Sequence, residues 1–126
     1  MNKEELIRLI DSLNLSNEDF TILSSGALVI RGILDIAHDL DIAVSENGLN
    51  KLSENFDLIS KGNNWYTVNE NIECVLDNME GKKELVDGYY LHDINQYLKE
   101  MESSNKEKHK LRIPLVKKYI NEKYYK

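Results

Sequence analysis

The 126-residue sequence predicts an α+β fold, in which a mixed β-sheet is flanked by helices and followed by C-terminal helices. Helical and strand-like hydrophobic patterns alternate through the first half, and a run of strand-like segments then precedes two helical ones. Helices interleaved with strands are typical of a sheet that helices cover. The length, and a sequence without repeats or linker-like tracts, predict a single domain over 1–126.

The first segments predict a helix, a strand and a second helix. Over 2–14, apolar residues recur at helical spacing behind Asn2 and Glu5, which have the spacing of a capping box. The apolar stretch 20–23 predicts a short buried strand. A helix over 24–33 is expected to follow it directly.

The segment 39–44 predicts a strand with two different faces. Because side chains alternate along a strand, one face receives Leu40, Ile42 and Val44, and the other receives Asp39, Asp41 and Ala43. Carboxylates of like charge repel each other when they are brought close together. The pair therefore requires a compensating positive charge.

The middle of the chain predicts one helix and several strands. A helix is expected over 45–55, and two strands over 56–60 and 65–69 read as a hairpin across the turn "KGNN". A further strand is expected over 71–78. The stretches "ELV" and "YYL", on either side of Gly88, predict either brief strands or extended links.

Two helices are expected to close the chain, over 94–101 and within 105–123. Pro114 must either kink the second of them or mark its first turn.

Small polar residues often cap helices, so Ser24 or Ser25 is expected to cap the helix that they open.

The charge of the chain is divided unevenly. Residues 106–126 hold eight basic and two acidic residues, for a net charge of +6, whereas residues 1–105 carry a net charge of −12. An acidic body argues against broad nucleic-acid binding. A single cysteine, Cys74, and a sequence without a signal peptide or a membrane-length apolar run predict a cytoplasmic protein.

Three acidic residues are candidate metal ligands. Asp39 and Asp41 share one strand face, and Glu73 lies in the middle of its own strand. Hard divalent cations such as Mg²⁺ prefer oxygen ligands, so these acids could hold one or two Mg²⁺ ions. The small residues Ser24 and Ser25 precede a helix, a place where phosphate groups often bind. Together these features favour phosphoryl or nucleotidyl transfer.

The stretch "LSSGALVIRGILDIAHDLDIAV" resembles the signature of the nucleotidyltransferase (polymerase-beta-like) superfamily. That signature is a hydrophobic residue, Gly, and Gly or Ser, followed after a spacer by Asp-hydrophobic-Asp/Glu-hydrophobic. Leu23-Ser24-Ser25 stands at its first element and, after thirteen residues, Asp39-Leu40-Asp41-Ile42 stands at its second. The likeness is greatest to small bacterial members of the superfamily, and "NIECVLD" is similar to their strand that bears the third acid.

The resemblance implies a nucleotidyltransferase-like fold and assigns roles to individual residues. Asp39, Asp41 and Glu73 would be the catalytic, Mg²⁺-binding acids, and Ser24, Ser25 and Lys108 would bind the nucleotide. The substrate would be a nucleoside triphosphate, with ATP favoured, and the acceptor a hydroxyl of a protein, a small molecule or an RNA end. The resemblance leaves the acceptor and the oligomeric state open.

Some residues depart from the superfamily pattern. Ser24 replaces the usual first Gly, and Leu34 and Ile36 stand where relatives often carry Arg and Thr. An alternative is therefore a degenerate, non-catalytic binding or regulatory module, for example a component of a toxin–antitoxin system. A third reading is an unrelated α/β domain whose aspartates lie at a surface site.

Overall fold

The computed structural model describes residues 1–124. Within this range the chain forms five α-helices, a 3₁₀ helix and seven strands. The elements are α1 (Lys3–Ser12), η1 (Asn17–Asp19), β1 (Phe20–Ile22), α2 (Ser24–Ile30), β2 (Leu40–Val44), α3 (Glu46–Asn55), β3 (Ile59–Gly62), β4 (Trp65–Asn69), β5 (Ile72–Leu76), β6 (Lys83–Val86), β7 (Tyr89–His92), α4 (Ile94–Glu102) and α5 (Glu107–Tyr124). This confirms an α+β chain that ends in helices.

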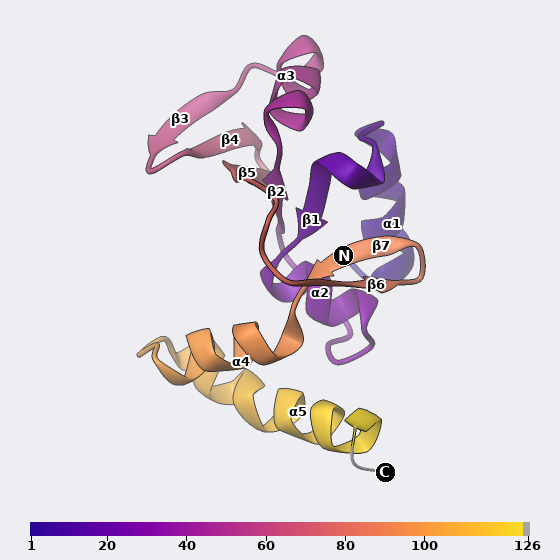
Figure 1. Ribbon diagram of the computed structural model, residues 1–126, viewed down its shortest axis with the longest axis vertical. Helices are drawn as coiled ribbons and strands as arrows, with labels where there is room; N and C mark the ends of the chain where they lie inside the picture. The colour runs from indigo at the N-terminus through magenta and orange to yellow at the C-terminus, as the bar shows by residue number, and fades with distance from the viewer. Residues whose placement is uncertain (125–126) are drawn as a thin grey trace.

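The strands form one mixed sheet in the order β3-β4-β5-β2-β1-β7-β6 (Figure 1). The pairs β2–β5 and β1–β7 are parallel, and the other neighbours are antiparallel. Parallel neighbours need a crossover connection, which places helices against the sheet. As expected, the sheet is mixed and carries helices. Within the described residues 1–124, no helix is both long and apolar enough to cross a membrane.

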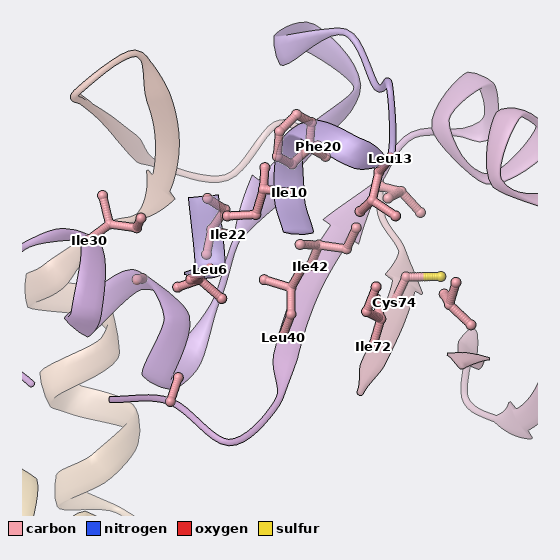
Figure 2. Packing of buried hydrophobic residues seen from close by; sticks show 14 of the residues in the cluster. Leu6, Ile10, Leu13, Phe20, Ile22, Ile30, Leu40, Ile42, Ile72 and Cys74 are labelled. Carbon is pink, nitrogen blue, oxygen red and sulfur yellow. The ribbon is translucent and has the colours of Figure 1, made fainter. Parts of the chain in front are cut away.

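One face of the central strands forms the main core. Figure 2 shows Leu40 and Ile42 of β2 beside Ile72 and Cys74 of β5, with α1 side chains packed against this face. Gly26 of α2 faces the same core, where an added Cβ would lie 3.2 Å from Ile22 Cγ2. The helix approaches the core closely at this glycine, because only a residue without a Cβ fits there without displacing its neighbour.

A second core joins the C-terminal helices to α2. Its fully buried members are Leu28, Ile94, Tyr97, Met101 and Val116, from α2, α4 and α5. The other buried residues of α2, such as Ala27 and Ile30, belong to the main core. Helix α2 therefore lies between the sheet and the antiparallel α4–α5 pair (Figure 1).

One hairpin differs from the expectation, and another decides between two alternatives. The first was expected to begin at 56–60, but β3 covers Ile59–Gly62, and the turn is Asn63-Asn64, with φ of 53° and 68°. Both residues adopt the left-handed conformation that two-residue hairpin turns need. The stretches around Gly88 are strands, because Asp87 and Gly88 form a turn of the same kind, with φ of 51° and 87°.

The helix ends also bring corrections. The expectation that Ser24 or Ser25 caps α2 is wrong, because the N-cap is Leu23 and makes no side-chain hydrogen bond. At α1, the expected capping box of Asn2 and Glu5 is present. Pro114 lies inside α5 and not in its first turn. Most of the basic segment 106–126 lies in α5, and its last two residues, 125–126, lie outside the described part of the chain.

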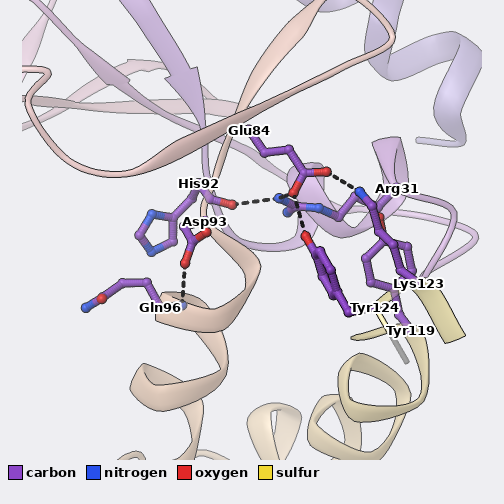
Figure 3. Close-up of polar contacts among 8 residues, drawn as sticks. All are labelled: Arg31, Glu84, His92, Asp93, Gln96, Tyr119, Lys123 and Tyr124. Carbon is purple, nitrogen blue, oxygen red and sulfur yellow. Dashed lines mark hydrogen bonds and ion pairs between the residues drawn. The ribbon is translucent and has the colours of Figure 1, made fainter. Parts of the chain in front are cut away.

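A charged cluster ties the end of α5 to the sheet edge (Figure 3). The Arg31 side chain is 1% exposed, and its Nη2 donates to the His92 carbonyl at 3.0 Å and lies 3.5 Å from Glu84 Oε2. Lys123 of α5 pairs with the same carboxylate, and Tyr124 Oη donates to it at 3.4 Å. We call Arg31, Glu84 and Lys123 the Glu84 network.

Candidate functional site

Asp41 and Glu73 stand directly opposite each other on neighbouring parallel strands. They are register partners between β2 and β5, and the pairs Leu40–Ile72 and Ile42–Cys74 flank them. The flanking residues are buried in the main core, whereas Asp41 and Glu73 are only half-buried. Because adjacent strands lie about 4.8 Å apart and side chains alternate, the two carboxylates leave the opposite face of the sheet side by side. We call Asp39, Asp41 and Glu73 the acid site.

Asp39 lies just before β2 and not within it. The expected strand 39–44 is one residue shorter, and Asp39 is exposed. It is nevertheless close enough for its charge to act on Asp41. The charges of Glu73 and Asp39 therefore both act on Asp41, and the expected three-acid metal site stays a prediction.

The Asp41 carboxyl is harder to ionise than a free aspartate. Burial raises its pKa above the ordinary value, and the negative charges of Glu73 and Asp39 raise it further. Lys108 and Lys61 act in the opposite direction and lower it. Repulsion among these acids exceeds the compensation that the two lysines supply, so a bound cation would relieve an existing excess of negative charge.

Two lysines approach the acid site from different elements. Lys108, an expected nucleotide-binding residue, comes from the first turn of α5. Lys61 comes from β3 and forms an ion pair with Glu73 Oε2. The sequence reading missed Lys61, because it ended this strand at residue 60. The dipeptide Asn63-Asn64, a two-residue turn signal, could have extended the strand to include it.

Ser24 and Ser25 form the beginning of α2, and this turn is tied to the acid site through the backbone. The Leu23 amide donates to the Asp41 carbonyl at 2.9 Å, so the turn begins next to the strand that carries Asp41. Ser24 has φ of 51°, in the left-handed region, and both serines are half-buried. That conformation suits glycine, which is the residue that the resemblance to nucleotidyltransferases implies at position 24.

The oxygen atoms of the acid site suit a hard divalent cation. Carboxylate oxygens are the ligands that Mg²⁺ prefers, and the acids here carry excess negative charge. Across residues 1–124, however, no three His, Cys, Asp or Glu side chains are already arranged as a metal-binding group. Glu73 instead contacts Lys61. A hollow of about 710 Å³ lies beyond the ends of β2 and β5, but neither Asp41 nor Glu73 lines it.

No protein-family model matches this sequence, and no curated protein matches it.

Proposed function

We propose that the chain is a small nucleotidyltransferase-like domain that transfers a nucleoside monophosphate from a nucleoside triphosphate to a hydroxyl group. One observation carries the proposal, namely that Asp41 and Glu73 are register partners on parallel strands, with the charge of Asp39 beside them. The sequence linked Glu73 to the two aspartates only through its place in a strand and through the resemblance to nucleotidyltransferases. The adjacency of Asp41 and Glu73, which are distant in the chain, supports that prediction.

The proposed roles follow from the position of each residue. Asp39, Asp41 and Glu73 would hold one or two Mg²⁺ ions, which when bound neutralise triphosphate oxygens and activate the attacking hydroxyl. Ser24 and Ser25 would contact the triphosphate, since the backbone bond between Leu23 and Asp41 keeps their turn beside the acids. Lys108 would supply positive charge from α5.

Ser24 is the main departure from the superfamily pattern, and its backbone bears on the proposal. A left-handed φ of 51° at a serine is uncommon, and it persists only where the surroundings impose it. The turn therefore keeps a glycine-like shape although the glycine is absent. The serine side chain adds a hydroxyl that could contact a phosphate oxygen.

A second candidate is a nucleotide-binding or regulatory module without catalysis, for example as part of a toxin–antitoxin pair. Its support is that the acids are not arranged as a three-ligand group within residues 1–124. Ile36 also presents an apolar side chain, 53% exposed, where relatives often carry a polar one. A protein acceptor or partner suits both candidates, and ATP is the favoured nucleotide in each.

The test is a titration of ATP with and without Mg²⁺, in the wild type and in Asp41→Asn. We expect Mg²⁺-dependent binding in the wild type and its loss in the variant. Asp57→Asn, which changes an exposed aspartate in the same way, should bind like the wild type. Absence of binding at millimolar ATP would contradict the proposal. Binding without release of pyrophosphate in the presence of acceptor extracts would favour the regulatory module.

A further inference from the structure

We infer that Lys61 is a positioning residue of the acid site: it holds Glu73 while no metal is bound, and a divalent cation displaces it. The inference rests on the metal-binding part of the proposed function. Its observations are the Lys61–Glu73 ion pair, the irregular strand that presents Lys61, and the exposure of that strand.

A β-bulge presents Lys61 to the acid site. The β3–β4 register pairs Ser60 with Tyr66 and Gly62 with Trp65, so Lys61 is the extra residue between these pairs. A bulge re-aims a side chain, and bulges are frequent beside active sites. The hairpin turn follows at once through Gly62, which has φ of 89°. The local backbone thus fixes where the Lys61 side chain begins.

Glu73 lies within reach of this side chain because of the order of the sheet. Strand β4 separates β3 from β5, and Thr67 of β4 pairs both with Ile59 of β3 and with Glu73 of β5. These three residues therefore share one sheet face. The ammonium of Lys61 crosses β4 on this face to reach Glu73, which places it on the side where Asp41 also projects.

The contact is suited to exchange. The Lys61 side chain is 47% exposed and that of Glu73 is 34% exposed, so water can reach both groups. Exposed ion pairs of this kind are weak, about 0.2–1 kcal/mol. All four residues of β3 are exposed, and β3 is an edge strand held by β4 alone. Segments with few buried contacts open readily, so Lys61 can leave without disturbing the core.

Lys61 differs from Lys108 in its partner. Lys108 belongs to α5, and its charge acts on Asp41, whereas Lys61 is bonded to Glu73. Displacement of Lys61 would free the Glu73 carboxylate to act together with Asp41.

The experiment measures the affinity of the metal-free protein for Mg²⁺ alone, by calorimetry and by the fluorescence of Trp65. Trp65 is the single tryptophan of the sequence, and it pairs with Gly62 of β3 and with Val75 of β5. We expect Lys61→Met to bind Mg²⁺ about two- to fivefold more tightly than the wild type, because the competing cation is gone. Lys61→Arg keeps the positive charge and should restore weaker binding.

Lys51→Met is the matched control. Lys51 is also a half-exposed lysine in an ion pair, with Glu54 at 3.8 Å, and its loss changes the net charge equally. Its Mg²⁺ affinity should equal that of the wild type. Equal affinities of Lys61→Met and the wild type would overturn the inference, as would equal gains in both lysine variants. The Mg²⁺ titration contains no nucleotide, so its outcome does not depend on catalysis. If Mg²⁺ binds as expected but a separate assay with ATP detects no transfer, the inference is supported and the proposed function fails.

A second measurement reads the hairpin directly. In the wild type, addition of Mg²⁺ should speed amide hydrogen exchange in β3, since the strand loses its tie to Glu73. Lys61→Met and Glu73→Gln should exchange at this faster rate without metal. If neither variant nor Mg²⁺ changes the exchange in β3, Lys61 does not hold Glu73, and the inference is wrong.

Discussion

The acid site and the Glu84 network are both clusters of charge on the same sheet, yet they are built in opposite ways. In the acid site, carboxylates of like sign are gathered on adjacent strands, and the pKa of Asp41 is raised by burial and by its neighbours. In the Glu84 network, opposite charges meet. Burial alone would raise the pKa of Glu84, but the Lys123 hydrogen bond and the charge of Arg31 outweigh it and lower the pKa.

The same contrast extends to the backbone. The turn that adjoins Asp41 holds Ser24 at a left-handed φ of 51°, a conformation that is unfavourable for serine. Near the network, Arg31 follows α2 with its backbone in the ordinary right-handed region, and its guanidinium reaches the His92 carbonyl. The acid site thus carries costs in charge and in backbone conformation, and the network carries stabilising pairs.

This difference indicates how the two regions are used. Unfavourable charge and strain persist in folded proteins mainly where a ligand or a reaction needs them. A region in which every charged group has an oppositely charged partner needs no ligand to explain it. The contrast favours the acid site as the functional one and the network as a clamp that fixes the end of α5.

Removal of the Glu84 carboxylate should have the largest effect on stability. Glu84→Gln leaves the guanidinium of Arg31, whose side chain is 1% exposed, without an ionised partner, because the new amide and the His92 carbonyl are both neutral acceptors. We expect the free energy of unfolding to fall by about 2–3 kcal/mol, less than the roughly 3–5 kcal/mol for a fully buried pair, because the Glu84 side chain is 22% exposed. Urea denaturation near pH 7 measures this loss.

The effect should depend on pH in a defined direction. Because the pKa of Glu84 is lower in the folded protein, its contribution is complete above the unfolded value and disappears as pH falls through the folded one. Glu80→Gln is the control, since it makes the same change at an exposed carboxylate four residues earlier. An equal loss in both variants would mean that the network is not a clamp.

The sequence predicted one side of this contrast much better than the other. Strict alternation in 40–44 and 72–76 gave the correct strand faces, because apolar residues must leave water and the acids must not. The signature spacing indicated Asp39 and Asp41, and the likeness of "NIECVLD" to a strand with a third acid indicated Glu73. That Asp41 and Glu73 are direct neighbours depends on the order of strands in the sheet. This order pairs residues 41 and 73, which lie far apart in the chain, and no local sequence pattern indicates it.

Lys61 and Arg31 were missed for different physical reasons. Lys61 depends on a bulge and on a two-residue turn, so an error of two residues at the end of β3 removed it from the sheet. Arg31 follows a short helix, where a charged residue is usually exposed, but its side chain is buried where it meets Glu84 of β6 and the His92 carbonyl at the end of β7. Both positions are decided by contacts between distant elements, which hydrophobic periodicity does not describe.

Relief of backbone strain at Ser24 should have an intermediate effect on stability. It tests the strain beside the acid site, which the Glu84 network lacks. Ser24→Gly removes the Cβ that is unfavourable at φ of 51°, so we expect the free energy of unfolding to rise by about 1 kcal/mol. Ser25→Gly, next along the chain and not in the left-handed region, should lower it slightly or leave it unchanged. A destabilised Ser24→Gly would show that the serine side chain makes a contact that outweighs its strain.

Neutralisation of Asp41 should have the smallest effect, and its pH dependence should be opposite to that of Glu84. The pKa of Asp41 is higher in the folded protein, so the unfolded chain loses this proton first as pH rises. Ionised Asp41 therefore lowers stability above the folded pKa, and the cost vanishes in acid. Metal-free Asp41→Asn should be more resistant to urea than the wild type near pH 7, and the gain should disappear toward about pH 3. Asp57→Asn, at an exposed position, should show no such gain. A loss of stability in Asp41→Asn near pH 7 would mean that Lys61 and Lys108 already compensate the acids, so that the site has no unmet need for a cation.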